Sequence, residues 1–281
     1  MIINNNMTAK NAYRNLNDNT AKMSDSIEKL SSGVRVNKAG DDAAGLAISE
    51  KMRAQVKGLD AAMKNAQNGI SLIQTAEGAL FDTHSILQRM RELSIQAAND
   101  TNTTSDRMQM QLEMDQLRQE LDRIAKTTEF NTRTLLDGDY SKVSDALNFH
   151  VGANKDQNMK ATLEKMDAEY LGVAGSDANK SISIETSSDA NKAVEKLDAA
   201  IEKVSNERAK YGAIQNRMEH SINNLGIASE NMQAAESRIR DTDVAKEMME
   251  LSKTKIITDS SASMLAQANT MPQEVLKLIE N

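Results

Sequence analysis

A heptad seam in the second half of the chain constrains the fold more than any other feature. Side chains that are apolar at eight of ten positions recur at alternating steps of three and four residues: Val194, Leu197, Ile201, Val204, Arg208, Tyr211, Gln215, Met218, Ile222 and Leu225. This spacing is typical of a helix that packs along its whole length. We predict one helix of about 50 residues from Asp189 to Arg238, roughly 75 Å long. A compact globule of this chain length would be only about 50 Å across, so we expect an elongated molecule.

Further seams predict the partner helices. An apolar stripe through Leu16, Met23, Ile27 and Leu30 indicates a first helix that ends near Gly33. The segment from residue 52 to 97 carries two adjacent apolar stripes, which requires more than one partner and so favours a bundle. A polar loop at 99–106, with Ser105 or Asp106 as the cap, leads into a third helix and predicts an antiparallel pair. The sequence therefore predicts a mainly α, elongated helical bundle or coiled coil.

Three glycines interrupt the second helical pattern. Gly58, Gly69 and Gly78 each weaken a helix by about 1 kcal/mol relative to alanine. We expect a close approach between helices to offset that cost.

The period changes in the segment 139–188, which predicts a small β-hairpin region. Leu147, Phe149 and Val151 alternate with polar residues, a turn follows, and 159–163 alternates again. A further short strand is expected at 181–186. A last helix is predicted from Val244 to Ala268, with Pro272 ending it before a final apolar turn.

Composition excludes several classes of protein. The chain has no cysteine, so disulfides and thiolate metal sites are excluded. Its net charge is −7 without a Lys/Arg block, so we expect no nucleic-acid partner. No apolar run of about 18 residues occurs, so we expect no membrane insertion, and the N-terminus lacks the features of a Sec signal. The motifs of phosphate-binding loops, nucleophile elbows and zinc proteases are missing, so we expect neither an enzyme nor a cofactor or metal.

Several blocks of sequence together resemble the bacterial flagellins. The N-terminal blocks are 29–37 (KLSSGVRVN) and 41–48 (DDAAGLAI), and the C-terminal blocks are 212–217 (GAIQNR), 237–243 (SRIRDTD) and 264–273 (MLAQANTMPQ). The resemblance covers nearly the whole chain. Flagellins carry large variable outer domains between positions equivalent to about Gly138 and Asp189, and here only a hairpin-sized segment stands there. The chain thus resembles a minimal flagellin.

The resemblance implies a domain organisation and a function. Residues 1–45, a coiled-coil helix and a spoke, would form an inner-core domain with 241–281, and 46–240 would form the bundle domain. Flagellins leave the cell unfolded through the flagellar type III apparatus and polymerise into the extracellular filament that drives swimming. The implied partners are further copies of the chain, an export chaperone, and cap and junction proteins. The terminal stripes are too narrow to form cores alone, so we expect neighbouring subunits to order them. The predicted polymerisation residues are Leu16, Met23, Ile27, Leu30, Val244, Met248, Leu251, Ile256, Leu265 and Leu276.

One stretch also resembles the segment by which many flagellins engage Toll-like receptor 5. It runs from Leu87 to Gln96, and Arg89, Leu93 and Glu113 fall at matching positions. Gln88, within the same stretch, is a further candidate. The resemblance implies that the monomer is recognised by this receptor. A plainer interpretation is a surface ion pair between Arg89 and Glu113 on antiparallel helices, on a surface that packs between subunits. The two interpretations are compatible.

Two other functions compete with that of a filament subunit. A hook–filament junction protein would share the architecture, and a cytoplasmic coiled-coil scaffold would share the heptads. The hairpin and the ordered set of motifs disfavour the scaffold. The methionine-rich stripes and His84 are interpreted as helix packing, because a ligand site needs several converging polar groups.

Overall fold

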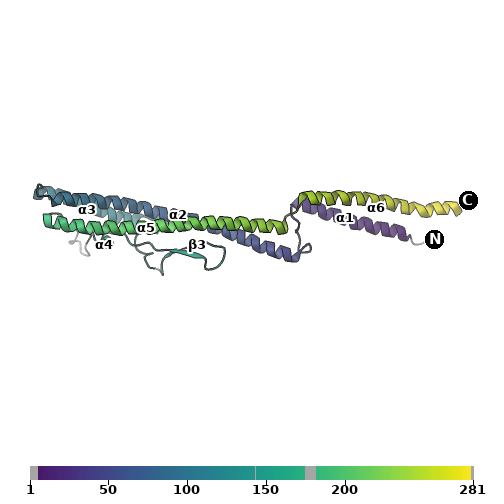
Figure 1. Ribbon diagram of the computed structural model, residues 1–281, viewed down its shortest axis with the longest axis horizontal. Helices are drawn as coiled ribbons and strands as arrows, with labels where there is room; N and C mark the ends of the chain where they lie inside the picture. Colours follow the sequence, from purple (N-terminus) through teal and green to yellow (C-terminus); the bar gives the residue numbers. More distant parts are fainter. Residues whose placement is uncertain (1–5, 143, 175–181, 280–281) are drawn as a thin grey trace. The chain divides into compact units, whose positions relative to one another are not determined.

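The computed structural model describes residues 6–142, 144–174 and 182–279, with side chains through Met271. Figure 1 shows long helices running side by side within each part of the chain. In chain order the elements are α1 (Met7–Ser32), α2 (Ala43–Ala98), α3 (Thr104–Thr127), β1 (Glu129–Phe130), β2 (Arg133–Thr134), β3 (Leu147–His150), β4 (Asn158–Ala161), α4 (Ala168–Leu171), α5 (Ser187–Arg240) and α6 (Val244–Ile279). The prediction of a mainly α fold with a small β region is confirmed.

The chain forms two compact units. The terminal unit comprises Met1–Val56 with Glu230–Asn281, and the central unit comprises Lys57–Ser229. The boundaries lie about ten residues from those expected at 45 and 240, because the ends of α2 and α5 belong to the terminal unit. Two ion pairs tie these ends together, Arg53 to Glu236 at 3.4 Å and Arg240 to Glu50 at 3.0 Å.

The central unit has one apolar core between α2, α3 and α5. The predicted long helix is confirmed as α5, and its seam residues Leu197, Val204, Tyr211 and Met218 are all fully buried. The other six seam residues are half-buried: Val194, Ile201, Arg208, Gln215, Ile222 and Leu225. At one of these positions the neighbour is buried instead, because Glu207 is 2% exposed beside the predicted Arg208. Lys210 donates to the Glu207 carboxylate at 2.8 Å and supplies the opposite charge. Burial raises the pKa of Tyr211, which stays neutral.

The N-terminus of α3 is capped differently from the prediction. Thr103, not Ser105 or Asp106, is the N-cap, so that prediction was wrong by two or three residues. The Thr103 hydroxyl accepts from the Asp106 backbone N–H at 3.3 Å, and the Asp106 carboxylate accepts from the Thr103 N–H at 2.9 Å. These bonds form a reciprocal capping box. The bonds that the Asp106 carboxylate accepts from the Thr103 N–H and hydroxyl lower the pKa of Asp106. The Thr-x-x-Asp spacing, rather than the last polar residue of the loop, sets the start of the helix.

The predicted β-hairpin is confirmed as β3 and β4, antiparallel with Phe149 opposite Met159. A second pair, β1 and β2, was not predicted. Its tight turn is formed by Asn131 and Thr132, both at positive φ, and lacks the Asn-Gly or Asp-Gly signature that marks such turns in a sequence.

The strand expected at 181–186 is wrong for its described part. Ser181 lies outside the described residues, and 182–186 forms no strand. The side-chain amide of Gln111 occupies the place of a neighbouring strand, because it donates to the Ile182 carbonyl at 3.1 Å and accepts from the Ile184 N–H at 2.8 Å. A side chain thus satisfies backbone groups that a sheet would otherwise pair.

The three glycines of α2 have different surroundings. A Cβ on Gly69 would lie 3.0 Å from the Phe149 ring of β3 and 3.1 Å from Met218 of α5. A Cβ on Gly58 would lie 3.0 Å from Ala153 in the hairpin turn, whereas one on Gly78 would meet nothing within 4 Å. Close approach therefore explains Gly69 and Gly58, mainly to the hairpin rather than to a helix, and does not explain Gly78.

Alanine substitutions at two of these glycines should have opposite effects. We expect Gly69→Ala to lower the free energy of unfolding by about 1–3 kcal/mol, because the added methyl group forces the hairpin or Met218 to move. Gly78→Ala should raise it by about 0.5–1 kcal/mol through helix propensity alone. Denaturant unfolding of the purified subunits measures both. If both substitutions changed the free energy of unfolding in the same direction, the close packing of the hairpin on Gly69 would be contradicted.

In the terminal unit, α1 packs antiparallel to α6. Asn6, the N-cap of α1, donates to the Ala268 carbonyl at 2.8 Å, and at the other end Val34 forms an antiparallel bridge with Asp241. The connector after α1 is ordered by bonds from the Arg35 and Val36 N–H groups to the Arg240 carbonyl.

The prediction that Pro272 ends the last helix was wrong. Helix α6 continues through Pro272 to Ile279. A proline removes one backbone hydrogen bond, and the following Glu, Leu and Lys residues favour helix strongly enough to continue it.

Candidate functional site

The contact between α1 and α6 is made by small and polar side chains. Ser26 of α1 is buried, as are Thr254, Ser261 and Ala268 of α6. The Asn19 side-chain amide donates to the Ser261 hydroxyl at 3.5 Å. Half-buried apolar residues lie at heptad spacing beside these groups: Leu16, Met23 and Leu30 on α1, and Leu251 and Leu265 on α6. Five of the ten predicted polymerisation residues therefore lie on the inner faces of the helix pair.

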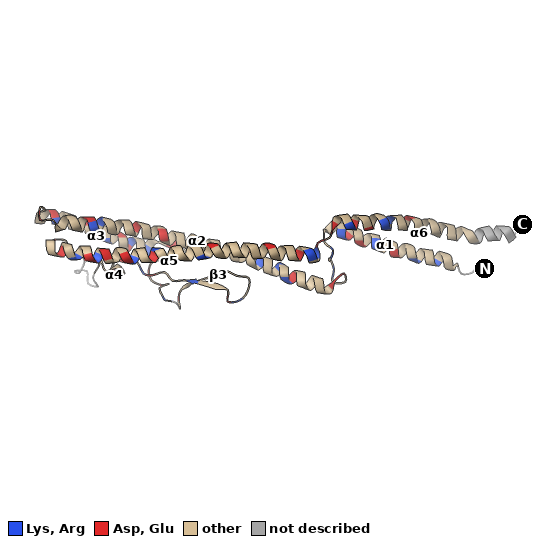
Figure 2. Cartoon of the chain, in the orientation of Figure 1, with Lys and Arg blue, Asp and Glu red and all other residues tan. Residues whose placement is uncertain are grey.

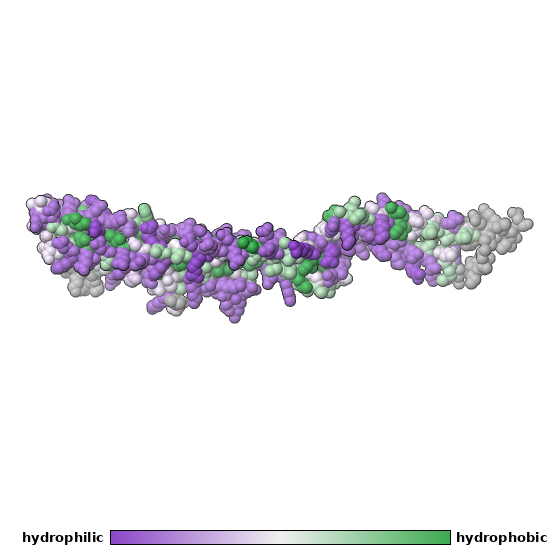
Figure 3. Space-filling view, viewed as in Figure 1, coloured by the Kyte–Doolittle hydropathy of each residue, from purple (hydrophilic) through white to green (hydrophobic). Residues whose placement is uncertain are grey.

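Four other predicted polymerisation residues are exposed. They are Ile27, Val244, Met248 and Ile256, the last of them 70% exposed. The side chain of Leu276 lies outside the described residues. Further large apolar side chains are exposed on the same two helices: Met7, Tyr13, Met249, Ile257, Met264 and Met271. Apolar colouring recurs along the visible face of α6 in Figure 3.

These exposed side chains define an outer apolar face of the α1–α6 pair. A helix in a two-helix pair can bury only one side, so the apolar residues on its other sides need a different partner. Charge is sparse along part of this face, because α6 has no charged residue from Ser260 to Met271 (Figure 2). Burying that segment against another apolar surface would desolvate few charges. The arrangement is suited to association of several chains.

The predicted receptor residues lie on the antiparallel helices α2 and α3. Arg89 of α2 pairs with Glu113 of α3 at 2.8 Å and with Glu92 at 3.2 Å. Bonds to Glu113 and then Glu92 raise the pKa of Arg89, which stays charged. Gln88 is exposed and lies 3.0 Å from His84, between Nε2 of each residue. Gln88, Arg89 and Glu113 are all exposed, and Arg89 and Glu113 form the expected ion pair.

Leu93 does not belong to that surface. It is 2% exposed and lies in the core with Met90 and Ala97, because positions three and four apart on α2 share its inner face. A protein partner could reach it only by opening the bundle. The large apolar side chains that are exposed on these helices include Ile95 on α2 and Leu112 on α3. Leu93 follows Met90 by three residues and so lies on the same side of the helix, which would have identified Leu93 as a core residue in the sequence.

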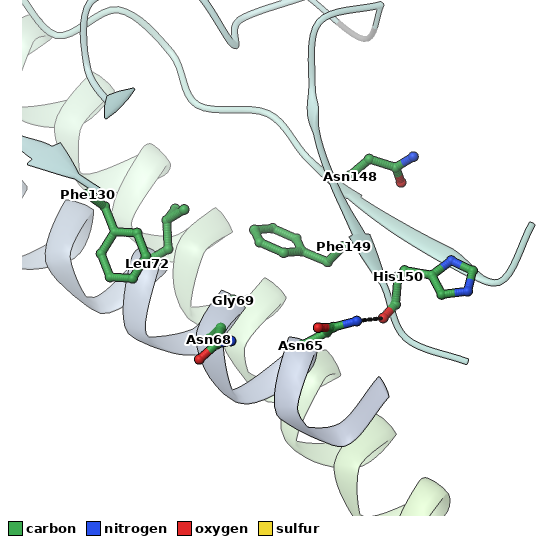
Figure 4. A pocket seen from close by; sticks show the side chains of 8 residues that line it. All are labelled: Asn65, Asn68, Gly69, Leu72, Phe130, Asn148, Phe149 and His150. Carbon is green, nitrogen blue, oxygen red and sulfur yellow. Dashed lines mark hydrogen bonds between the residues drawn. The ribbon is translucent and has the colours of Figure 1, made fainter. Parts of the chain in front are cut away.

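A pocket of about 350 Å³ lies where the β3–β4 hairpin covers α2. Figure 4 shows Phe149 projecting over Gly69, with Phe130 and Leu72 at one end and Asn65 bonded to the His150 carbonyl at 3.4 Å. Its polar lining consists of three asparagines and one histidine, without an acid or a nucleophile. Among the described residues there is also no group of three or more His, Cys, Asp or Glu placed to hold a metal ion. The pocket offers no set of catalytic groups.

None of the helices in the described part of the chain combines the length and apolarity of a membrane span.

Comparison with known proteins assigns the family. The model of the bacterial flagellin N-terminal helical region matches residues 3–141, and that of the C-terminal helical region matches 194–279. A flagellin of Halalkalibacterium halodurans is 52% identical over 99% of this chain and its own full length. The flagellar filament 30.7 kDa core protein of Treponema maltophilum is 50% identical over 99% of the chain and its full length. In fold alone, the structure of a putative flagellar hook-associated protein from Vibrio parahaemolyticus matches with a TM-score of 0.59, at 14% identity over 72% of this chain and 100% of that one. The chain belongs to the bacterial flagellin family.

Proposed function

We propose that this protein is a structural subunit that polymerises with copies of itself into the helical filament of the bacterial flagellum. The observation that carries the proposal is the outer apolar face of the α1–α6 pair, in a chain of flagellin sequence from end to end. A cytoplasmic scaffold would not need this face. The family assignment and the architecture together favour a filament subunit over an enzyme.

The proposal assigns different tasks to the two units. The central unit has its own core and folds as a subunit, while the terminal helices complete their burial against neighbouring copies. In this account the filament is extracellular, and the subunit is secreted through the flagellar export apparatus with an export chaperone. Cap and junction proteins would contact the ends of the polymer. The full-length match to filament core proteins favours the main filament subunit over a junction protein.

Concentration-dependent assembly tests this function. Purified subunits are incubated at a series of concentrations, sedimented, and inspected by electron microscopy. We expect a critical concentration above which long, uniform helical filaments form. A scaffold would instead give small soluble oligomers of fixed size at every concentration, and that outcome would exclude the proposal.

We also propose that the free subunit is recognised by Toll-like receptor 5 through the surface of Gln88, Arg89 and Glu113. The support is the exposed ion pair and the match of Arg89 and Glu113 to the receptor-binding stretch of the family, with Gln88 exposed beside them. Leu93 is left out because it is buried. An assembled filament would hide this surface if it packs between subunits, so recognition is expected of the monomer.

A pair of arginine substitutions tests the receptor proposal. Arg89→Ala should weaken receptor binding on the order of tenfold, since arginines are frequent hot spots of interfaces. The matched control is Arg123→Ala, which removes another exposed pair, to Glu120 on α3. Because exposed ion pairs contribute little to stability, both variants should melt like the parent chain. Surface plasmon resonance with the receptor ectodomain measures binding, and equal losses for the two variants, or none, would contradict the proposal.

A further inference from the structure

Methionine is distributed unequally between the two units. In the central unit six methionines are buried: Met90, Met110, Met114, Met159, Met166 and Met218. On α6 all four are exposed: Met248, Met249, Met264 and Met271. The same residue type therefore fills the core in one unit and forms a large part of an outer surface in the other.

The exposed thioethers alternate with isoleucines along α6. Met249 precedes Ile256 by seven residues, and Met264 follows Ile257 by seven, which places each pair on one side of the helix two turns apart. Met249 is 67% exposed and Met264 is 65% exposed. Both therefore belong to the outer apolar face and are open to small reagents in the free subunit.

The composition makes exposed thioethers the first targets of an oxidant. The chain has neither cysteine nor tryptophan, so no thiol or indole competes for a peroxide. The methionine sulfur attacks one peroxide oxygen, the O–O bond breaks and an S–O bond forms. Sulfur loses two electrons and the peroxide is reduced. For hydrogen peroxide, the leaving hydroxide takes the proton of the newly formed S–OH group, which gives water and the sulfoxide. The product, methionine sulfoxide, is polar and is returned to methionine by sulfoxide reductases.

We propose that Met248, Met249 and Met264 form an oxidation site on the free subunit, and that peroxide oxidation there blocks polymerisation reversibly. The proposal rests on the proposed function, because it assigns these residues to the surface that neighbouring copies bury. A sulfoxide on that surface must be buried without a designated hydrogen-bond donor, which disfavours association. The six core methionines are shielded, so the central unit keeps its fold under the same exposure.

The test treats purified full-length subunits with hydrogen peroxide and maps sulfoxides by peptide mass spectrometry. Met248, Met249 and Met264 should be oxidised well before Met90 and Met218. The critical concentration of the oxidised subunit should rise on the order of tenfold, as expected for burying an unpaired polar group. Treatment with both stereospecific methionine sulfoxide reductases and a thiol should restore it. Simultaneous oxidation of core and outer methionines, or assembly unaffected by oxidation, would overturn the proposal.

Leucine variants locate the effect. The triple variant Met248→Leu, Met249→Leu, Met264→Leu keeps apolar volume and should lose much less of its assembly on peroxide treatment than the parent chain, because only Met7 and Met271 remain as exposed methionines of the outer apolar face. The control Met108→Leu changes an exposed methionine of α3 and should stay as sensitive as the parent chain. A triple variant that loses assembly on oxidation as the parent does would refute the site. If reduced parent subunits fail to assemble at all, the proposed function is wrong, and the order of oxidation still tests the assignment of the exposed thioethers.

Discussion

A chain that ends at Asp243 is expected to remain folded and soluble and to form no filaments. The deletion removes α6, which carries most of the outer apolar face and is the helix against which α1 packs. The central unit keeps its core of α2, α3 and α5, because none of those residues belongs to α6. Assembly should therefore be lost completely, while most of the helical signal remains.

Circular dichroism measures whether the shortened chain remains folded, and sedimentation measures whether it forms filaments. The far-ultraviolet signal should fall only by the share that α6 and an unpaired α1 contribute. The control is the full-length chain, purified and assembled in parallel. Filaments of ordinary length from the shortened chain would show that the terminal pair does not hold the polymer together.

The second large effect separates folding from assembly by two substitutions. Leu197 of α5 is 0% exposed, and Leu197→Ala should lower the free energy of unfolding of the central unit by about 2–5 kcal/mol. That corresponds to a melting temperature lower by roughly 5–15 °C. At low temperature this variant should still assemble, because the outer apolar face is unchanged.

Ile256→Ala on α6 is the matched substitution. The side chain is exposed in the subunit, so its removal should leave subunit melting unchanged while raising the critical concentration for assembly. Calorimetry of subunits and sedimentation of filaments, applied to both variants, give four results. If each substitution altered both properties to the same degree, the division between a self-folding central unit and an assembling terminal pair would be wrong.

The long helices could be predicted because their signal is periodic over many turns. The seam of α5 continues through Met218 without a proline, and the alternation at Leu147 and Phe149 is the corresponding signal of a strand. Local features with few residues were less predictable. Helix α3 starts at a capping box that competes with two other polar candidates, and the β1–β2 turn uses Asn131 and Thr132 without glycine. Helix α6 passes Pro272 because propensity beyond a proline can outweigh one lost hydrogen bond.

The sequence could assign the candidate residues to helices but not to one face of each helix. Leu93 and Arg89 are one turn apart on α2, yet one lies in the core and the other in an exposed ion pair. Leu16 and Ile27 lie on the same amphipathic helix, yet Leu16 is half-buried and Ile27 is exposed. A heptad pattern gives the apolar sides of a helix, and only the position of the partner determines which side is used within the subunit. Glu207, buried one residue from the predicted Arg208, follows the same rule.

Three-dimensional reconstruction of the assembled polymer by electron cryomicroscopy tests the central claim most directly. The claim is that the outer apolar face of the α1–α6 pair is the contact between subunits. It predicts uniform helical filaments in which Met249, Ile256 and Met264 are buried against α1 or α6 of neighbouring copies. Filaments in which these side chains face solvent, with subunits joined only through the central unit, would contradict it.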